Sequence, residues 1–217
     1  KMSKSIGNTI SIADFLNDWH FEVLRLAFLQ NQYSSNIDLN TEVFRTCRKR
    51  LFYYYETLLR LHTEAQKTQD SSTKDLSESQ KKRIKNFEDS FIKAMCDDFN
   101  TPVSLAHINK YLRWLNQQNL SQLNTNAIKE LQASFTPMQK VLGLVSEDPR
   151  TFLESQKNKV LLDLDISESD INTLISQRQD AREQKDWQKS DEIRDQLLAK
   201  GIALNDDVSG THWMLVP

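Results

Sequence analysis

Apolar residues recur every three or four positions over long stretches of the chain, a spacing that predicts amphipathic helices. The first predicted helix follows the polar residues 1–8, and Ser11 or Asp14 is its expected N-cap. Its apolar face consists of Phe15, Leu16, Trp19, Val23, Leu24, Ala27 and Phe28. A second helix is predicted from about Thr41 to Ala65. Its apolar face consists of Val43, Phe44, Cys47, Leu51, Tyr54, Tyr55, Leu58 and Leu61.

The segments on either side of the second helix lack this spacing. Residues 31–40 are rich in Asn and Ser, which predicts a loop. Residues 67–79 contain one apolar side chain, Leu76, among Ser, Thr, Gln, Lys and Asp. A segment so poor in apolar side chains has little to bury, and we predict a mobile linker there.

The middle of the chain predicts three more helices. Asn100 is the expected N-cap of the second of these, with Pro102 in its first turn. The third begins near Thr125; Pro137 either kinks or restarts it, and Gly143 closes it. The three apolar faces consist of Ile84, Phe87, Phe91 and Met95, of Leu105, Ile108, Leu112 and Leu115, and of Ile128, Leu131 and Phe135. Short connections between such helices favour an antiparallel bundle.

The end of the chain changes character. Helical spacing returns after Ser167 and stops near Gly201. Residues 202–204 and 212–216 then flank a run of turn-forming residues, 205–210, which predicts a small hairpin. The predicted fold class is therefore mainly α: an antiparallel helical bundle followed by a small C-terminal α+β module that ends in a hairpin.

Composition and charge limit the function. The net charge of -2 argues against a protein that coats nucleic acid by bulk electrostatics, so any such contact needs local patches. No apolar run approaches the roughly 18 residues of a membrane span, and no export signal is visible, so a cytosolic protein is expected.

The cysteines and histidines give no sign of a metal site. Cys47 and Cys96 lie far apart within apolar-periodic segments, and we expect both to be buried, reduced thiols. The four histidines have no metal-ligand spacing, and no pair of acids or nucleophile with its base stands out. No complete catalytic centre and no metal site are expected in these residues.

Two kinds of lysine- and arginine-bearing segment are candidates for phosphate binding. Lys1-Met2-Ser3-Lys4-Ser5 places two mobile ammonium groups on a short polar segment, where they could stabilise a triphosphate. The alternative is a solvated terminus. Runs of basic residues are candidates for nucleic-acid phosphates or are the solvated sides of helices. These runs are Arg45, Arg48, Lys49 and Arg50, and Lys81, Lys82, Arg83 and Lys85.

These motifs carry a resemblance to a known family. KMSKS at residues 1–5 is the second signature of class I aminoacyl-tRNA synthetases. Residues 94–102, AMCDDFNTP, resemble the AMDDDFNTP segment of cysteinyl-tRNA synthetases, with Cys96 in place of an acid, and residues 32–39 resemble that family's HYRSPLDF loop. The family's C-terminal signature resembles Arg178-Gln179-Asp180-Ala181-Arg182, Asp186-Trp187, Asp191-Glu192-Ile193-Arg194-Asp195, Gly201-Ile202 and Gly210-Thr211-His212-Trp213. The resemblance covers the whole chain.

The resemblance implies roles for particular residues. It implies that ATP is bound through Lys4, assisted by Lys1, Ser3 and Ser5. It also implies that the anticodon of tRNA is recognised by Arg182, Trp187, Asp191 and Asp206. An arginine donates hydrogen bonds to base edges, aspartates accept them, and tryptophan stacks on bases. The alternatives are that Trp187 is a core residue, that Arg182 and Asp191 form surface ion pairs, and that Asp206 forms a turn.

The implied function is that of the tRNA-binding part of a cysteine-tRNA ligase, an enzyme that activates cysteine with ATP and transfers it to its tRNA. Three domains are expected: a KMSKS loop and stem-contact segment, 1–40; a helical bundle, 41–148; and an anticodon-recognition module, 149–217. The role of residues 149–165 stays open.

The family's Rossmann catalytic domain with its zinc ion is not among these residues, so the chain alone is expected to be inactive. A monomer is expected. Two alternatives remain, a non-catalytic tRNA-binding or scaffolding module and the homologous cysteine:amino-sugar ligase, which needs no anticodon recognition.

Overall fold

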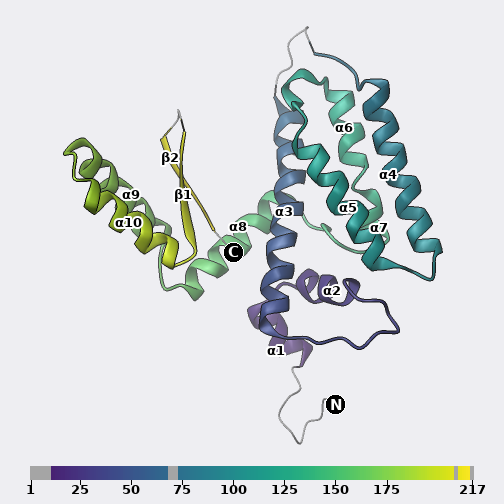
Figure 1. Cartoon of the computed structure of the whole chain (residues 1–217), viewed down its shortest axis with the longest axis horizontal. Helices are drawn as coiled ribbons and strands as arrows, with labels where there is room; N and C mark the ends of the chain where they lie inside the picture. Colours follow the sequence, from purple (N-terminus) through teal and green to yellow (C-terminus); the bar gives the residue numbers. More distant parts are fainter. Residues whose placement is uncertain (1–10, 68–72, 208–209, 216–217) are drawn as a thin grey trace, which may run out of the picture. The chain divides into compact units, whose positions relative to one another are not determined.

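The computed structural model describes residues 11–67, 73–207 and 210–215, and it confirms the predicted fold class. Helices dominate, and one antiparallel hairpin follows them near the C-terminus (Figure 1). The chain divides into two compact units, Lys1–Phe152 and Leu153–Pro217.

The first predicted helix is two helices, so that prediction was wrong. Helix α1 spans Ile12–Asp18 and helix α2 spans Phe21–Leu29. Ser11 caps α1, as expected, by accepting a hydrogen bond from the Asp14 amide at 3.0 Å. The chain is extended at Trp19 and His20, where the His20 ring accepts from the Glu22 amide at 3.2 Å and so caps α2. A side-chain cap at that point begins a new helix, although the apolar spacing continues across the break.

A bundle of helices forms the larger part of the first unit. It consists of α3 (Thr41–Gln66), α4 (Glu78–Cys96), α5 (Thr101–Asn116), the 3₁₀ turn η2 (Leu120–Gln122), α6 (Thr125–Ala133) and α7 (Thr136–Lys140). Helices α3, α4, α5 and α6 lie side by side, as Figure 1 shows. Asn100 caps α5 as predicted. Pro137 occupies the first turn of α7, where its missing N–H costs nothing, and it therefore restarts the helix.

Part of the predicted mobile linker is packed, so that prediction was wrong for residues 73–79. Leu76 is only 4% exposed. Lys74 pairs with Leu123 in an isolated parallel bridge. The Lys74 N–H donates to the Gln122 carbonyl at 2.9 Å, and the Lys74 carbonyl accepts from the Asn124 N–H at 2.8 Å. Ser77 and Gln80 form a capping box at the start of α4. One buried leucine and two backbone hydrogen bonds thus hold the segment against the connection between α5 and α6.

The two cysteines differ in burial. Cys47 is fully buried, whereas Cys96 is exposed at the C-terminal end of α4, so the expectation of two buried thiols was wrong for Cys96. Burial raises the pKa of the Cys47 thiol to about 11. Both thiols are free.

A buried carboxylate joins α2 to the loop that follows α7. Glu22 has no exposed surface, and it accepts hydrogen bonds from the backbone N–H groups of Val145 (2.8 Å) and Ser146 (2.9 Å), from the Ser146 hydroxyl (2.5 Å) and from the Tyr55 hydroxyl (2.9 Å). Val145 has a φ of 57°, which is strained for a β-branched residue. Burial raises the pKa of Tyr55, so its hydroxyl stays protonated and donates. The Glu22 carboxylate thus holds a strained loop in place.

Helix α8 (Pro149–Asp163) accounts for most of the segment 149–165 that the sequence left open. Near its start, Phe152 is fully buried and stacks on Tyr55 with a centroid distance of 3.6 Å. Near its end, Leu161 belongs to the core of the second unit.

The second unit contains α9 (Glu168–Glu183), α10 (Trp187–Ala199) and the strands β1 (Ile202–Asp207) and β2 (Gly210–Leu215). The helices pack against each other, and β1 packs on α10. Pairing in the hairpin runs from Ile202 opposite Leu215 to Asp207 opposite Gly210. The strand β1 therefore includes Asn205 and Asp206, which were predicted to lie in the turn. The small core consists of Leu161, Ile171, Ile193, Leu197 and Ile202.

Candidate nucleic-acid interface

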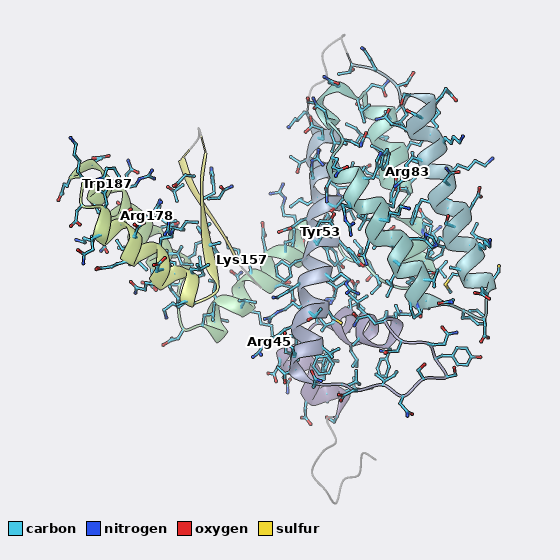
Figure 2. All side chains as sticks on the ribbon, viewed as in Figure 1. Arg45, Tyr53, Arg83, Lys157, Arg178 and Trp187 are labelled. Carbon is cyan, nitrogen blue, oxygen red and sulfur yellow. The ribbon has the colours of Figure 1, made fainter. Side chains whose placement is uncertain are left out.

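The turn between α9 and α10 presents a large aromatic side chain to solvent. Lys185 has a left-handed φ of 61°, and the Asp186 side chain accepts from the Lys189 amide at 3.1 Å, which caps α10. Trp187 is the first residue of α10 and is 60% exposed. The structure thus contradicts the alternative that Trp187 is a core residue. Figure 2 shows Trp187 and Arg178 within this unit.

Asp206 is the centre of a polar cluster that joins α9 to the hairpin. Its Oδ1 accepts from Arg178 Nη1 at 3.0 Å and from the Thr211 hydroxyl at 2.6 Å. Its Oδ2 accepts from Arg178 Nη2 and from Arg182 Nη1, each at 3.0 Å. Thr211 lies directly opposite Asp206 in the hairpin. Asp206 is therefore part of an ordered network.

This network holds Asp206 in its ionised form. The hydrogen bonds from Arg178, and then from Thr211, hold the pKa of Asp206 far below its usual range, and the nearby positive charges of Arg178 and Arg182 add to this effect. Desolvation of the carboxylate opposes this lowering of the pKa, but less strongly than the hydrogen bonds from Arg178 and Thr211 favour it. At neutral pH the carboxylate is therefore only an acceptor of hydrogen bonds.

The two arginines of the cluster differ in exposure. The side chain of Arg178 is 9% exposed, whereas that of Arg182 is 39% exposed. A bidentate arginine–carboxylate pair fixes both groups in distance and direction. Arg178 thus anchors the cluster inside the unit, and Arg182 extends it to the surface.

Asp191 lies on α10, four residues after Trp187, so the two side chains share one face of the helix. Its carboxylate is 62% exposed and lies 3.5 Å from Arg194, a surface pair of the kind that contributes little to stability. The structure therefore brings together Arg182 and Asp206 by direct contact, and Trp187 and Asp191 by helical spacing.

Arg178 and Thr211 belong to the C-terminal signature quoted from the sequence, but no role in the site was predicted for either. Arg178 precedes Arg182 by four residues, a spacing that places both on one face of α9 and that was a usable signal. Nothing in the sequence pairs either arginine with Asp206, which lies 28 residues after Arg178.

Two segments of the family resemblance meet in the first unit. The Tyr33 hydroxyl donates to the Asp98 carboxylate at 3.0 Å, and the Gln32 amide donates to the Asp98 carbonyl at 3.2 Å. Asp98 and Phe99 both have left-handed φ values, 51° and 50°. Beside them lies an open hollow of about 680 Å³, lined by Phe28, Leu29, Asn31, Tyr33, Ile37, Asp98, Phe99 and Thr101.

The basic runs on α3 and α4 already have some neighbours. Arg45 lies 3.6 Å from Glu42, and the Arg48 guanidinium lies over the Trp19 ring at 4.8 Å. On α4, Lys81 pairs with an acid one turn away at 3.2 Å. Figure 2 shows Arg45 on α3 and Arg83 on α4. These runs are thus partly engaged by neighbouring side chains and keep exposed cationic groups as candidates for phosphate contacts.

The predicted ATP-binding residues Lys1, Ser3, Lys4 and Ser5 lie outside the described residues. Within the described part of the chain, no group of three or more His, Cys, Asp or Glu side chains is arranged to hold a metal ion. None of the described helices is long and apolar enough to cross a membrane.

Comparison with protein families gives three successive matches along the chain. The tRNA synthetases class I (C) catalytic domain matches residues 1–49. The DALR domain matches residues 90–146, from the end of α4 through α7. The cysteinyl-tRNA ligase anticodon binding domain matches residues 167–213, which include the Asp206 cluster and Trp187.

Comparison with curated relatives gives matches over almost the whole chain. The cysteine-tRNA ligase of Desulfotalea psychrophila is 36% identical over 221 residues, covering 98% of this chain and 45% of that protein. That of Geobacter sp. (strain M21) is 34% identical, covering 98% and 44%, and that of Coxiella burnetii (strain RSA 493) is 33% identical, covering 98% and 42%. The chain spans less than half the length of these relatives. By these matches and the three family models, the chain is similar to cysteinyl-tRNA synthetases over almost its whole length.

Proposed function

We propose that this chain is the tRNA-binding part of a cysteine-tRNA ligase, which activates cysteine with ATP to cysteinyl adenylate and transfers it to the cysteine tRNA. The relatives of this chain carry that name, and the family implies ATP as a substrate. The match to an anticodon binding domain favours this function over the amino-sugar ligase, which needs no such domain. The match to a catalytic domain at residues 1–49 favours it over a non-catalytic module.

Within this function, we propose that residues of the second unit recognise the anticodon. The observation that carries the proposal is the exposed Trp187, at 60%, in a segment that matches an anticodon binding domain. A large aromatic ring at the surface supplies a plane on which an unstacked base stacks. The guanidinium of Arg182 and the carboxylate of Asp191, both solvent-accessible, supply donors and acceptors for base edges. Asp206 belongs to this site through its hydrogen bond from Arg182.

We propose further that Lys4, with Lys1, Ser3 and Ser5, binds the phosphates of ATP. This proposal rests on the KMSKS motif and on the match of residues 1–49 to a class I catalytic domain. A lysine ammonium on a flexible stem follows the phosphate oxygens as charge develops during adenylate formation.

The test is the affinity of the whole chain, at one moderate salt concentration, for cysteine tRNA and for the same tRNA with its anticodon bases replaced. Replacement of each recognised base should weaken binding by about 1 to 3 kcal/mol. Trp187→Ala and Arg182→Ala should each reduce that difference. Equal affinity of the native chain for both tRNAs would refute anticodon recognition and leave only contacts to phosphates.

Two further variants separate recognition from bulk charge and from folding. Lys189→Ala removes an exposed positive charge from α10 on the side opposite Trp187 and Asp191, so it should weaken binding to both tRNAs equally. Trp187→Phe keeps an aromatic plane and should keep most of the discrimination that Trp187→Ala loses.

A further inference from the structure

Asp206 has no free position at which to accept another hydrogen bond. A carboxylate has two oxygens with about four lone-pair sites. Arg178 occupies one site on each oxygen, Thr211 occupies the second site on Oδ1, and Arg182 occupies the second site on Oδ2. A base amine that approached this carboxylate would therefore have to displace one of these donors.

Arg182, in contrast, has hydrogen-bond donors to spare. A guanidinium carries five N–H donors in a fixed plane. The structure gives Arg182, among the described residues, one hydrogen bond from Nη1 to Asp206, and its side chain is 39% exposed. This bond holds Nη1 beside Asp206 and leaves its remaining donors available. Arg182 is thus held by one edge and is accessible from the others.

Arg178 holds the other side of the carboxylate and is shielded from a ligand. Its side chain is 9% exposed, and both of its terminal nitrogens are engaged with Asp206 at 3.0 Å. Its Nε is buried with no hydrogen-bond partner among the described residues. A buried arginine tolerates this position because the bidentate pair compensates its charge. Removal of Asp206 would leave that charge buried and uncompensated.

We infer that Arg178 and Asp206 are positioning residues, and that Arg182 is the one of the three that contacts the anticodon. Asp206 orients the Arg182 guanidinium, and Arg178 fixes Asp206 from within the unit. This arrangement suits a base edge that carries hydrogen-bond acceptors for the guanidinium, such as the O6 and N7 atoms of guanine. It does not suit a base whose amine would have to donate to the Asp206 carboxylate. This inference rests on the proposed anticodon recognition and assigns Asp206 an indirect part in it.

A double-mutant cycle on tRNA discrimination tests the inference. The whole chain is prepared as the native sequence, Asp206→Asn, Arg182→Ala and the double variant. For each, the ratio of affinities for cysteine tRNA and for the anticodon-replaced tRNA is measured. Asp206→Asn in the native background should lower this ratio about tenfold, since it loosens Arg182. In the Arg182→Ala background it should change the ratio less than about twofold, since Arg182 is the group through which it acts.

Three outcomes would overturn the inference. If Asp206→Asn lowers the ratio equally in both backgrounds, Asp206 contacts the base directly. If it leaves the ratio unchanged while Arg182→Ala lowers it, Arg182 needs no positioning by Asp206. If the native chain has a high ratio of affinities and Arg182→Ala leaves it unchanged, other residues recognise the anticodon and only this inference fails. If the ratio of the native chain is itself near one, the proposed anticodon recognition fails as well.

Two variants keep the test decisive. Asp180→Asn removes a negative charge from an exposed position of α9 and should strengthen binding to both tRNAs equally, which calibrates the charge effect of Asp206→Asn. If Asp206→Asn unfolds the second unit, as seen by circular dichroism, Arg178→Lys takes its place in the cycle. Lysine keeps the buried positive charge but loses the bidentate fork. Arg178→Lys should also lower the ratio only where Arg182 is present, although residue 178 is too buried to contact RNA.

Discussion

Substitution of Glu22 by glutamine tests whether a buried carboxylate determines the stability of the first unit. The Oε1 atom of Glu22 accepts three hydrogen bonds, from the Tyr55 hydroxyl and from the N–H and hydroxyl of Ser146, and Oε2 accepts one from the Val145 N–H. A glutamine can place its amide oxygen where Oε1 lies. Its NH₂ group then faces the Val145 N–H, so two donors oppose each other in a site with no exposed surface.

The expected cost follows from this geometry. A buried N–H left without an acceptor costs about 1–3 kcal/mol, so Glu22→Gln should lower the free energy of unfolding by roughly 2 kcal/mol. Glu22→Ala leaves the Tyr55 hydroxyl and two backbone N–H groups without their acceptor, and its cost should reach about 3–5 kcal/mol. Either loss is a large share of the 5–15 kcal/mol that stabilises a typical domain.

Urea unfolding followed by far-UV circular dichroism measures both variants, and amide hydrogen exchange at Val145 and Ser146 locates the effect. Both amides should exchange faster in Glu22→Gln. Glu42→Gln is the matched control, since the Glu42 side chain is 73% exposed and its replacement should stay within about 0.5 kcal/mol of the native chain. A cost for Glu22→Gln as small as that of the control, with unchanged exchange at both amides, would refute the reasoning.

Three further predictions concern other sites. At pH 8 a disulfide-exchanging reagent should label Cys96 quickly and Cys47 slowly, because burial raises the pKa of Cys47 to about 11; Cys96→Ser should abolish the fast phase. The Arg60 guanidinium donates to three carbonyl groups at and just after the end of α5, so Arg60→Ala should lower the free energy of unfolding in urea by about 1–3 kcal/mol. The lowered pKa of Asp206 means that its contribution to stability is complete above the ordinary carboxyl pKa of about 4 and is lost as the pH falls towards the folded-state value. Thermal unfolding of Asp206→Asn should therefore depend less on pH than that of the native chain below pH 4, and an unchanged pH dependence would contradict this.

The sequence predicts the long helices of the first unit because local signals and packing agree there. Helix α3 was expected from Thr41 to Ala65 and spans Thr41–Gln66, and Asn100 caps α5 as expected. The break between α1 and α2 escaped prediction because apolar spacing continues across it. The break depends on His20, which caps α2 and also contacts Glu147, 127 residues later, at 2.9 Å. A partner so distant in sequence leaves no local signal.

Burial of single residues escaped prediction for a related reason. Leu76 lies in a polar segment, yet it is buried two residues after Lys74, which pairs with Leu123 in a backbone bridge. Cys96 lies in an apolar-periodic helix, yet it is not on the buried face of α4, which consists of Ile84, Phe87, Phe91 and Ala94. A tertiary contact thus decided the burial of Leu76, and the position around the helix decided the exposure of Cys96.

The candidate site was predictable as a set of residues and not as an arrangement. Family resemblance supplied Arg182, Trp187, Asp191 and Asp206. The saturation of Asp206 by Arg178 and Thr211 depends on how α9 meets the hairpin, and no spacing in the sequence encodes that meeting.

The position of Asp206 in its strand also bears on how the hairpin pairs. Ile202, Leu204 and Asp206 alternate along β1 and therefore share one face, which packs on the core at its first two positions and meets the arginines at its third. A shift of one residue in the pairing register would turn Ala203 and Asn205 to that face and leave Arg178 without a counter-ion. A two-stranded hairpin is only marginally stable by itself, so its register depends on the contacts of its buried face. Asp206 and Arg178, the pair inferred to position Arg182, thus also act as a register lock, so substitution of either residue is expected to produce mispaired hairpins as well as weakened binding.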